Sequence, residues 1–235
     1  MSVGVGDEGS FAPHVRSNEE PFQLIVEAID QVGLRPGQDV GIACDPASSE
    51  FFDNGYYHLR TEDRRLNSEE MVNYYQHLVD SYPLILLEDG MAQDDWDGWK
   101  ALNSQLGSRI ELVGDDLFCT NPSIIARGIE ENVANAVFIK LNQIGTLTET
   151  IAATRLAHAH GWGAFVSHRS GETVDSFIAD MTVALDTGHL KTGAPARGER
   201  VEKYNQLLRI EEYLGETARY AGINAYCRKP EIAGN

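Results

Sequence analysis

The chain has 235 residues, of which 42% are apolar and 23% charged, proportions that are ordinary for a globular protein. Its formal net charge of −17 argues against a nucleic-acid-binding protein, because nucleic-acid phosphates would be repelled. The charge does not exclude small anionic substrates, since a metal ion or a local cluster of Lys and Arg can reverse the sign inside a site.

The cysteines and the apolar segments indicate where the protein works. Cys44, Cys119 and Cys227 are widely spaced and form no metal-ligand pattern, which suits free thiols in a reducing compartment. No apolar run approaches the length needed to cross a membrane, and residues 1–6 do not have the shape of a signal peptide. We therefore expect a cytoplasmic protein without a membrane segment.

The first third of the chain predicts a loop, a helix, a strand and a small hairpin. Residues 6–13 are rich in turn formers, and a capping-box pattern at 17–20 starts a helix that Gly33 ends. Residues 40–45 then form a short apolar strand with an acid at its end. Four aromatic residues around an Asp-Asn-Gly turn in 51–60 predict a hairpin outside the main pattern.

The remainder of the chain alternates between strands and helices. Helix starts are marked by capping residues at Asn67 and Thr146 and by Pro122. A long amphipathic helix is expected after the last strand, with an apolar face of Val201, Tyr204, Leu207, Leu208 and Ile210 towards a core. The tail from Tyr220 is expected to be irregular and on the surface. Apolar runs predict further strands at 84–88, 110–115, 136–140, 163–168 and 189–191.

Each predicted strand ends on a charged or titratable residue: Asp45, Glu88, Asp115, Lys140, His168 and Lys191. After a first gap of 43 residues, which contains the hairpin, these ends are 23 to 28 residues apart, about the length of one strand–helix unit. Alternating strands and helices imply a parallel sheet with helices outside, and in a barrel the carboxyl ends of the strands meet on one face. The alternative is a doubly wound open sheet, which would need a glycine-rich phosphate turn that the sequence lacks in the right place.

Three of the strand ends form a candidate metal site. Asp45, Glu88 and Asp115 would repel one another if brought together unpaired, and Mg²⁺ removes that conflict because it prefers oxygen ligands. Any one of these acids alone is better explained as a helix cap or a solvated group. Three in the same register favour the metal site.

The other strand ends supply a candidate base and a candidate anion pocket. Lys140 follows four apolar residues, which disfavours an edge strand, and a lysine held near other cations can act as a base. The turn at 167–173 carries His168, Arg169 and Ser170, and Arg at a helix start is suited to phosphate. A satisfied core histidine is the alternative for His168. The implied chemistry is proton abstraction next to a carboxylate, with a metal stabilising the enolate.

The motifs resemble those of the enolase (phosphopyruvate hydratase) family, in family order and over nearly the whole chain. The resemblance rests on residues 6–9, 45–51, 88–90, 114–117, 140–147, 167–172, 191–195 and 203–211. It implies an enolase-type TIM barrel and a glycolytic lyase that dehydrates 2-phosphoglycerate to phosphoenolpyruvate, reversibly in gluconeogenesis.

The resemblance also implies a role for each site residue. Asp45, Glu88 and Asp115 would ligate Mg²⁺, and Lys140 would take the C2 proton of the substrate. Glu8, which spacing alone would not single out, would help the C3 hydroxyl to leave. Arg169 and Ser170 would hold the phosphate, His168 would line the same pocket, and Lys191 would contact the substrate carboxylate.

The sequence departs from the family pattern in small and large ways. Ser10 and Pro46 stand where Gly and Cys are common, and Ala196 and Gly198 stand where hydroxyl residues are common. More importantly, enolases carry an N-terminal domain and two barrel strands before the Glu8 loop. We therefore expect residues 1–235 to form the C-terminal barrel domain, with about six of eight βα units and without the N-terminal capping domain.

Three functional readings remain open at this stage. The first is an enolase, and the second is a truncated, non-catalytic fragment that binds only a metal or partners. The third is another lyase or racemase on the same scaffold, which Lys140, Lys191 and the His168 turn disfavour. Enolases commonly form homodimers through the N-terminal domain, so a homodimer is the oligomer to test.

Overall fold

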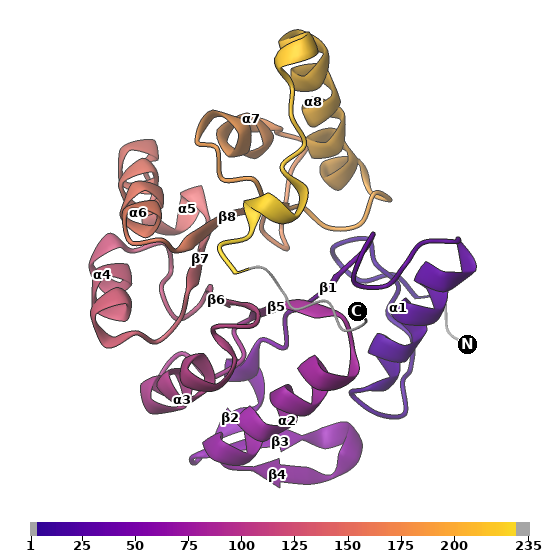
Figure 1. Ribbon diagram of the computed structural model, residues 1–235, viewed down its shortest axis with the longest axis vertical. Helices are drawn as coiled ribbons and strands as arrows, with labels where there is room; N and C mark the ends of the chain where they lie inside the picture. Colours follow the sequence, from indigo (N-terminus) through magenta and orange to yellow (C-terminus); the bar gives the residue numbers. More distant parts are fainter. Residues whose placement is uncertain (1–3, 229–235) are drawn as a thin grey trace.

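A computed structural model describes residues 4–228 of the chain (Figure 1). Its main feature is a six-stranded sheet in the order β1-β5-β6-β7-β8-β9, in which every neighbouring pair is parallel. The strands are β1 (Ile42–Cys44), β5 (Leu84–Glu88), β6 (Glu111–Gly114), β7 (Ala136–Ile139), β8 (Gly163–Ser167) and β9 (Leu190–Lys191). The sheet curls about the centre of the view with the helices outside it. The fold is therefore the incomplete parallel barrel that the sequence predicts.

The helices follow the strands in alternation. They are α1 (Glu20–Gln31), α2 (Ser68–Ser81), α3 (Trp96–Leu106), α4 (Pro122–Glu131), α5 (Leu141–Ile144), α6 (Leu147–Ala159), α7 (Phe177–Ala184) and α8 (Gly198–Leu214). The predicted caps at Asn67 and Thr146 are confirmed, because their side chains accept backbone N–H bonds at the starts of α2 and α6. Asn121 caps α4 in the same way, before Pro122. The predicted capping box at 17–20 forms only in part: Ser17 Oγ accepts the Glu20 N–H at 3.1 Å, but α1 begins after Glu19, which makes no side-chain cap bond. No helix in the described part of the chain is long and apolar enough to cross a membrane.

The predicted hairpin is larger than expected. It forms a three-stranded antiparallel sheet of β2 (Phe52–Asp53), β3 (Tyr56–Leu59) and β4 (Arg64–Leu66). Tyr57 anchors this sheet, since its ring is fully buried and its hydroxyl donates to Asp95 Oδ2 at 2.7 Å. The third strand has little sequence signal of its own, because Arg64 and Arg65 are exposed and only Leu66 is buried.

Apolar side chains fill two cores, one on each face of the sheet. The larger core lies between the sheet and the helices. The smaller one lies inside the curl and contains Leu86, Val113, Ala136, Phe138 and Phe165. Both faces of the strands are therefore buried, which explains their continuous apolar sequences.

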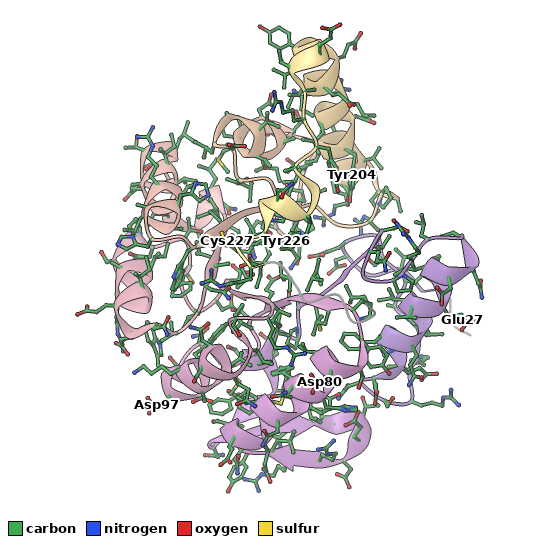
Figure 2. All side chains as sticks on the ribbon, viewed as in Figure 1. Glu27, Asp80, Asp97, Tyr204, Tyr226 and Cys227 are labelled. Carbon is green, nitrogen blue, oxygen red and sulfur yellow. The ribbon has the colours of Figure 1, made fainter. Side chains whose placement is uncertain are left out.

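The C-terminal tail and α8 differ from the sequence prediction. Tyr226, labelled near the centre of Figure 2, packs against the inner core, with its ring 6.4 Å from that of Phe165. The tail is thus not confined to the surface. The apolar face expected on α8 is also largely exposed, with Leu208 63% accessible, whereas Arg200 and Lys203 are its buried residues.

The interior also depends on one buried amide. Asn135 accepts from the Leu112 N–H at 2.7 Å and donates to the carbonyls of Gly107 and Ile110 at 2.9 and 3.0 Å. These bonds tie the segment before β7 to the segment that leads into β6. Removing the amide would take one hydrogen bond from each of these three backbone groups, of which the Gly107 carbonyl would keep the bond it accepts from Arg228 Nε at 3.1 Å. Each buried group left without a partner costs about 1–3 kcal/mol.

We predict that Asn135→Ala lowers the free energy of unfolding by roughly 3 kcal/mol, measured by urea denaturation. The matched control is Asn73→Ala, at an exposed position on α2, which should change it by less than about 0.5 kcal/mol. Equal effects at the two positions would show that the buried amide does not stabilise the barrel.

Candidate active site

Lys191 joins the two ends of the sheet. Its Nζ donates to Asp45 Oδ2 at 2.9 Å and to Glu88 Oε2 at 2.6 Å. Lys191 ends β9, whereas Asp45 follows β1 at the opposite end of the sheet order. The same nitrogen lies 5.2 Å from the centre of the Phe138 ring, which belongs to the inner core. The carboxyl ends of the first and last strands therefore meet above the inner core.

Burial controls the ionisation of these groups. It raises the pKa of Glu88 to about 9, and the ammonium of Lys191 opposes that rise. Burial lowers the pKa of Lys191, but the charges of Glu88 and Asp45 outweigh it, so the net pKa is raised. Because this pKa already includes the effect of Lys191, Glu88 needs further positive charge to be a carboxylate near neutral pH.

Lys140 contacts the third predicted acid. It follows β7, and its Nζ donates to Asp115 Oδ2. The other oxygen, Asp115 Oδ1, accepts from Gln143 Nε2 at 3.2 Å. Thr120 holds this group in place, because its hydroxyl donates to Gln143 at 2.7 Å and accepts the Lys140 N–H at 2.9 Å. Both the carboxylate and the lysine are therefore positioned by defined bonds.

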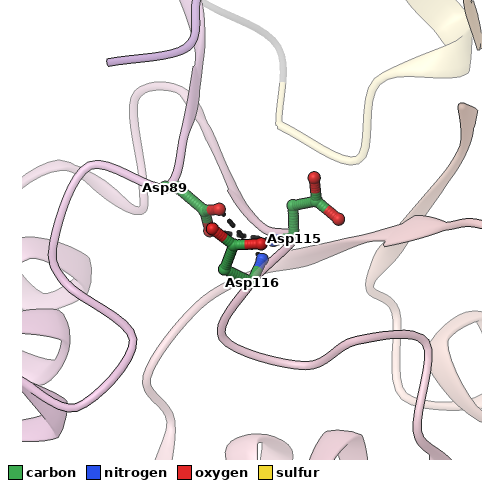
Figure 3. Close-up of side chains that lie close together, drawn as sticks. All are labelled: Asp89, Asp115 and Asp116. Carbon is green, nitrogen blue, oxygen red and sulfur yellow. Dashed lines mark hydrogen bonds between the residues drawn. The ribbon is translucent and has the colours of Figure 1, made fainter. Parts of the chain in front are cut away.

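Asp89, an acid that is not among the three predicted metal ligands, fixes the backbone at the end of β6 (Figure 3). Its two oxygens each accept a backbone N–H at 2.9 Å, one from Asp115 and one from Asp116. Burial raises the pKa of Asp89 to about 7, and the two N–H bonds oppose the rise. These bonds orient the turn from which the Asp115 side chain projects.

The remaining predicted residues form a group beside β8 and β9. Glu8 Oε1 lies 3.3 Å from His168 Nε2 and accepts from Ser170 Oγ at 3.3 Å. Arg169 Nη1 donates to Asn142 at 2.8 Å, within the segment that follows Lys140. Burial lowers the pKa of His168 to about 4, more than the charge of Glu8 raises it, so the ring is neutral near pH 7. The Glu8 loop thus lies against the turn predicted to hold an anion.

The carboxylate oxygens of the three predicted acids are ligands that suit a hard divalent cation. Burial also leaves Glu88 in need of further positive charge. Among residues 4–228, one trio of acids can place an oxygen from each within 4.8 Å of the others: Asp89, Asp115 and Asp116. It shares only Asp115 with the predicted trio. Both oxygens of Asp89 already accept backbone hydrogen bonds. Asp45 and Glu88, in contrast, already share one positive group, the ammonium of Lys191. The metal-site prediction therefore remains Asp45, Glu88 and Asp115.

A separate cavity of about 570 Å³ lies beside β1, between α1, α2 and the small sheet. Asp45 is the one predicted site residue in its lining, which is mostly apolar. The other charged groups described above lie outside it, and we place the candidate site at the carboxyl ends of the strands.

Sequence reasoning missed several residues that shape the site. Asp89 was visible only as a second acid after Glu88, with no pattern to indicate its backbone bonds. Thr120 has φ +55°, which is unusual for a β-branched residue and gives no sequence signal. Arg200 lies on a helix that was read as amphipathic, so its burial against His168 was unexpected.

Comparison with known proteins agrees with this architecture. Residues 1–229 match the family model described as enolase, C-terminal TIM barrel domain. A protein named enolase 2 from Pseudomonas syringae pv. syringae (strain B728a) is 63% identical over 227 residues, covering 97% of this chain and 53% of the relative. Enolase 2 of Methanospirillum hungatei is 62% identical and enolase 1 of Chlorobaculum tepidum 54%, each over 96% of this chain and 53% of the relative. The chain thus spans about half the length of these relatives.

The geometry at Asp89 gives a prediction with a neighbouring control. Asp89→Asn turns an N–H₂ group towards a backbone N–H, so we expect the free energy of unfolding to fall by about 1–3 kcal/mol in urea denaturation. Asp116→Asn, at an exposed side chain, should change it by less than about 0.5 kcal/mol. A neutral Asp89→Asn would show that this acid does not hold the turn.

Proposed function

This chain belongs to the enolase family, and we propose that it takes part in the enolase reaction, the reversible dehydration of 2-phosphoglycerate to phosphoenolpyruvate. We assign residues 1–235 to the C-terminal barrel domain of such an enzyme. The observation that supports the proposal best is that Lys140 contacts Asp115, and Lys191 contacts Asp45 and Glu88, at the carboxyl ends of the strands. Catalytic groups collect at that end in barrel enzymes.

Lys140 is the proposed base. Its stem is largely buried after an apolar strand, and its amine is held at Asp115 by a direct contact. A lysine can remove a proton only when its amine is neutral, so substrate binding must move the Nζ away from Asp115 or add positive charge nearby. The amine then takes the C2 proton of 2-phosphoglycerate.

Asp45, Glu88 and Asp115 are the proposed ligands of Mg²⁺. When bound, the ion would supply positive charge against the negative charge that grows on the substrate carboxylate. Lys191 Nζ donates hydrogen bonds to two of the three acids, so its ammonium can also donate to the substrate carboxylate beside them. Its displacement from Asp45 and Glu88 would free their oxygens.

The group beside β8 and β9 would bind and activate the rest of the substrate. Arg169 and Ser170 are proposed to hold the phosphate, with neutral His168 donating a hydrogen bond to it. Glu8 lies within 3.3 Å of His168 and Ser170, which places an acid next to the proposed phosphate pocket. We propose that it gives a proton to the departing C3 hydroxyl.

A second candidate is a non-catalytic chain that binds only a metal or partners. One observation favours it: the acids proposed as metal ligands are already paired with lysines. As an enolase, the protein would act in glycolysis and in the cytoplasm, and a homodimer is the proposed oligomer.

The proposed base can be tested directly. With Mg²⁺ and 2-phosphoglycerate, phosphoenolpyruvate formation followed by absorbance should fall by roughly 10²- to 10⁴-fold in Lys140→Ala. Lys100→Ala is the control, because Lys100 is a partly exposed lysine on α3 that pairs with Glu131. Activity that persists in Lys140→Ala would contradict the assignment, and an inactive parent chain that still binds Mg²⁺ would favour the second candidate.

The metal site predicts a separate binding result. Calorimetric titration with Mg²⁺ should show at least roughly tenfold weaker binding by Glu88→Gln, because a carboxylate ligand is lost. Glu69→Gln removes one negative charge from the exposed surface of α2 and should leave the affinity unchanged within error. Equal affinities in the two variants would remove Glu88 from the metal site.

A further inference from the structure

Two fully buried cations lie on the same helix. Arg200 and Lys203 of α8 are both 0% exposed, although the apolar residues of that helix are largely accessible. Burying a charged side chain is costly unless its hydrogen-bonding groups find partners. The question is therefore what these two side chains hold.

Arg200 binds the turn of the candidate anion pocket and the loop of Glu8 together. Its Nη1 lies 2.6 Å from His168 Nδ1 and donates to the Arg169 carbonyl at 2.8 Å. Its Nη2 donates to the carbonyls of Ser170 at 2.7 Å and Asp7 at 3.1 Å. One guanidinium thus joins segments that are more than 160 residues apart in the sequence.

The contact with His168 fixes where its ring proton lies. A guanidinium can only donate hydrogen bonds, so Nδ1 must accept and carries no proton. The proton of the neutral ring is then on Nε2, the nitrogen that lies 3.3 Å from Glu8 Oε1. Nε2 has no hydrogen-bond partner of good geometry within residues 4–228. It is therefore a donor directed towards the candidate anion pocket.

We propose that Arg200 is a positioning residue, which holds His168 as an Nε2–H donor and keeps the Glu8 loop against the Arg169–Ser170 turn. The role as a positioning residue rests on the proposed function, whereas the tautomer of His168 does not. The hydrogen bonds of Arg200 go to the ring nitrogen and to backbone carbonyls, and its Nε lies 3.8 Å from Glu199 Oε1, so it acts through the residues that it holds.

The loop after β9 is shaped to admit this guanidinium. Gly193 has φ +82°, and a Cβ there would lie 2.7 Å from the Glu8 carbonyl and 2.9 Å from Arg200 Cδ. The next residue, Ala194, donates its N–H to the same Glu8 carbonyl at 2.9 Å. The Glu8 loop, Gly193 and the Arg200 stem are therefore packed without room for a side chain at 193.

Lys203 provides a matched control. It is equally buried on the same helix and binds the same turn, with Nζ donating to the Thr173 and Glu199 carbonyls and lying 3.5 Å from Glu172 Oε1. Within the described residues it forms no hydrogen bond with His168. Replacing it should weaken the fold as replacing Arg200 does, but should leave the ring proton of His168 on Nε2.

The test uses ¹⁵N-histidine labelling of the full chain and NMR detection of the ring nitrogens, with His168 assigned through His168→Gln. At neutral pH the parent should show an unprotonated Nδ1 and a protonated Nε2. Arg200→Met should give a mixture of tautomers and a titration midpoint higher by roughly one pH unit, because a neighbouring positive charge is lost. The charged groups that face the ring are Glu8, Arg200, Lys191 and Glu172, of which only Arg200 is changed.

The expected pattern is that the tautomer and the midpoint both change in Arg200→Met and partly return in Arg200→Lys. In Lys203→Met the tautomer should persist and the midpoint should shift by less than in Arg200→Met, because the charge lost there lies beside Glu172 rather than beside the ring. A protonated Nδ1 in the parent chain would overturn the proposal without any variant, and so would an Arg200→Met that keeps the parental tautomer and midpoint. If Arg200→Met does not fold, the parent and Arg200→Lys spectra decide. Because no substrate is needed, these results stand apart from the enolase assay: an inactive chain with the predicted tautomer would contradict only the proposed function.

Discussion

The contact of Lys191 with Asp45 and Glu88 is the interaction on which the site depends. Asp45 follows the first strand of the curled sheet and Lys191 ends the last, so their contact requires the sheet to curl and bring its two ends together. The apolar inner core beneath them, including Phe138, excludes water and makes the unpaired charges costly. Lys191 must therefore move away from Asp45 and Glu88, or share their oxygens, when another cation or a substrate binds.

Buried polar groups around the site orient its side chains through hydrogen bonds. Asp89 sets the backbone of Asp115, Thr120 sets that of Lys140, and Arg200 sets the turn of His168. Each of these bonds joins one strand–helix unit to a neighbouring or distant segment. The fold brings the carboxyl ends of the strands to one end of the barrel. The buried polar groups around them, Asp89, Thr120 and Arg200, form a second layer that orients the site side chains.

The sequence was sufficient to predict the parallel sheet and its helices, but not the small sheet in full or that second layer. Continuous apolar strands, caps such as Asn67 and the regular spacing of charged strand ends predicted the parallel order, because each signal is local. The third strand of the small sheet and the burial of Tyr226 depend on distant partners and were missed. Arg200 was missed for the same reason, since nothing in its own helix shows that a guanidinium will bind carbonyls of residues 7, 169 and 170.

The most direct test of this account is the coupling free energy between Lys191 and Glu88. It is obtained from urea denaturation of the parent, Lys191→Met, Glu88→Gln and the double variant, in the absence of added metal. A shared buried contact predicts that the two single effects depart from additivity by about 1–3 kcal/mol. Effects that add to within about 0.3 kcal/mol would show that Lys191 of β9 does not contact Glu88 of β5, and would contradict the arrangement of the site.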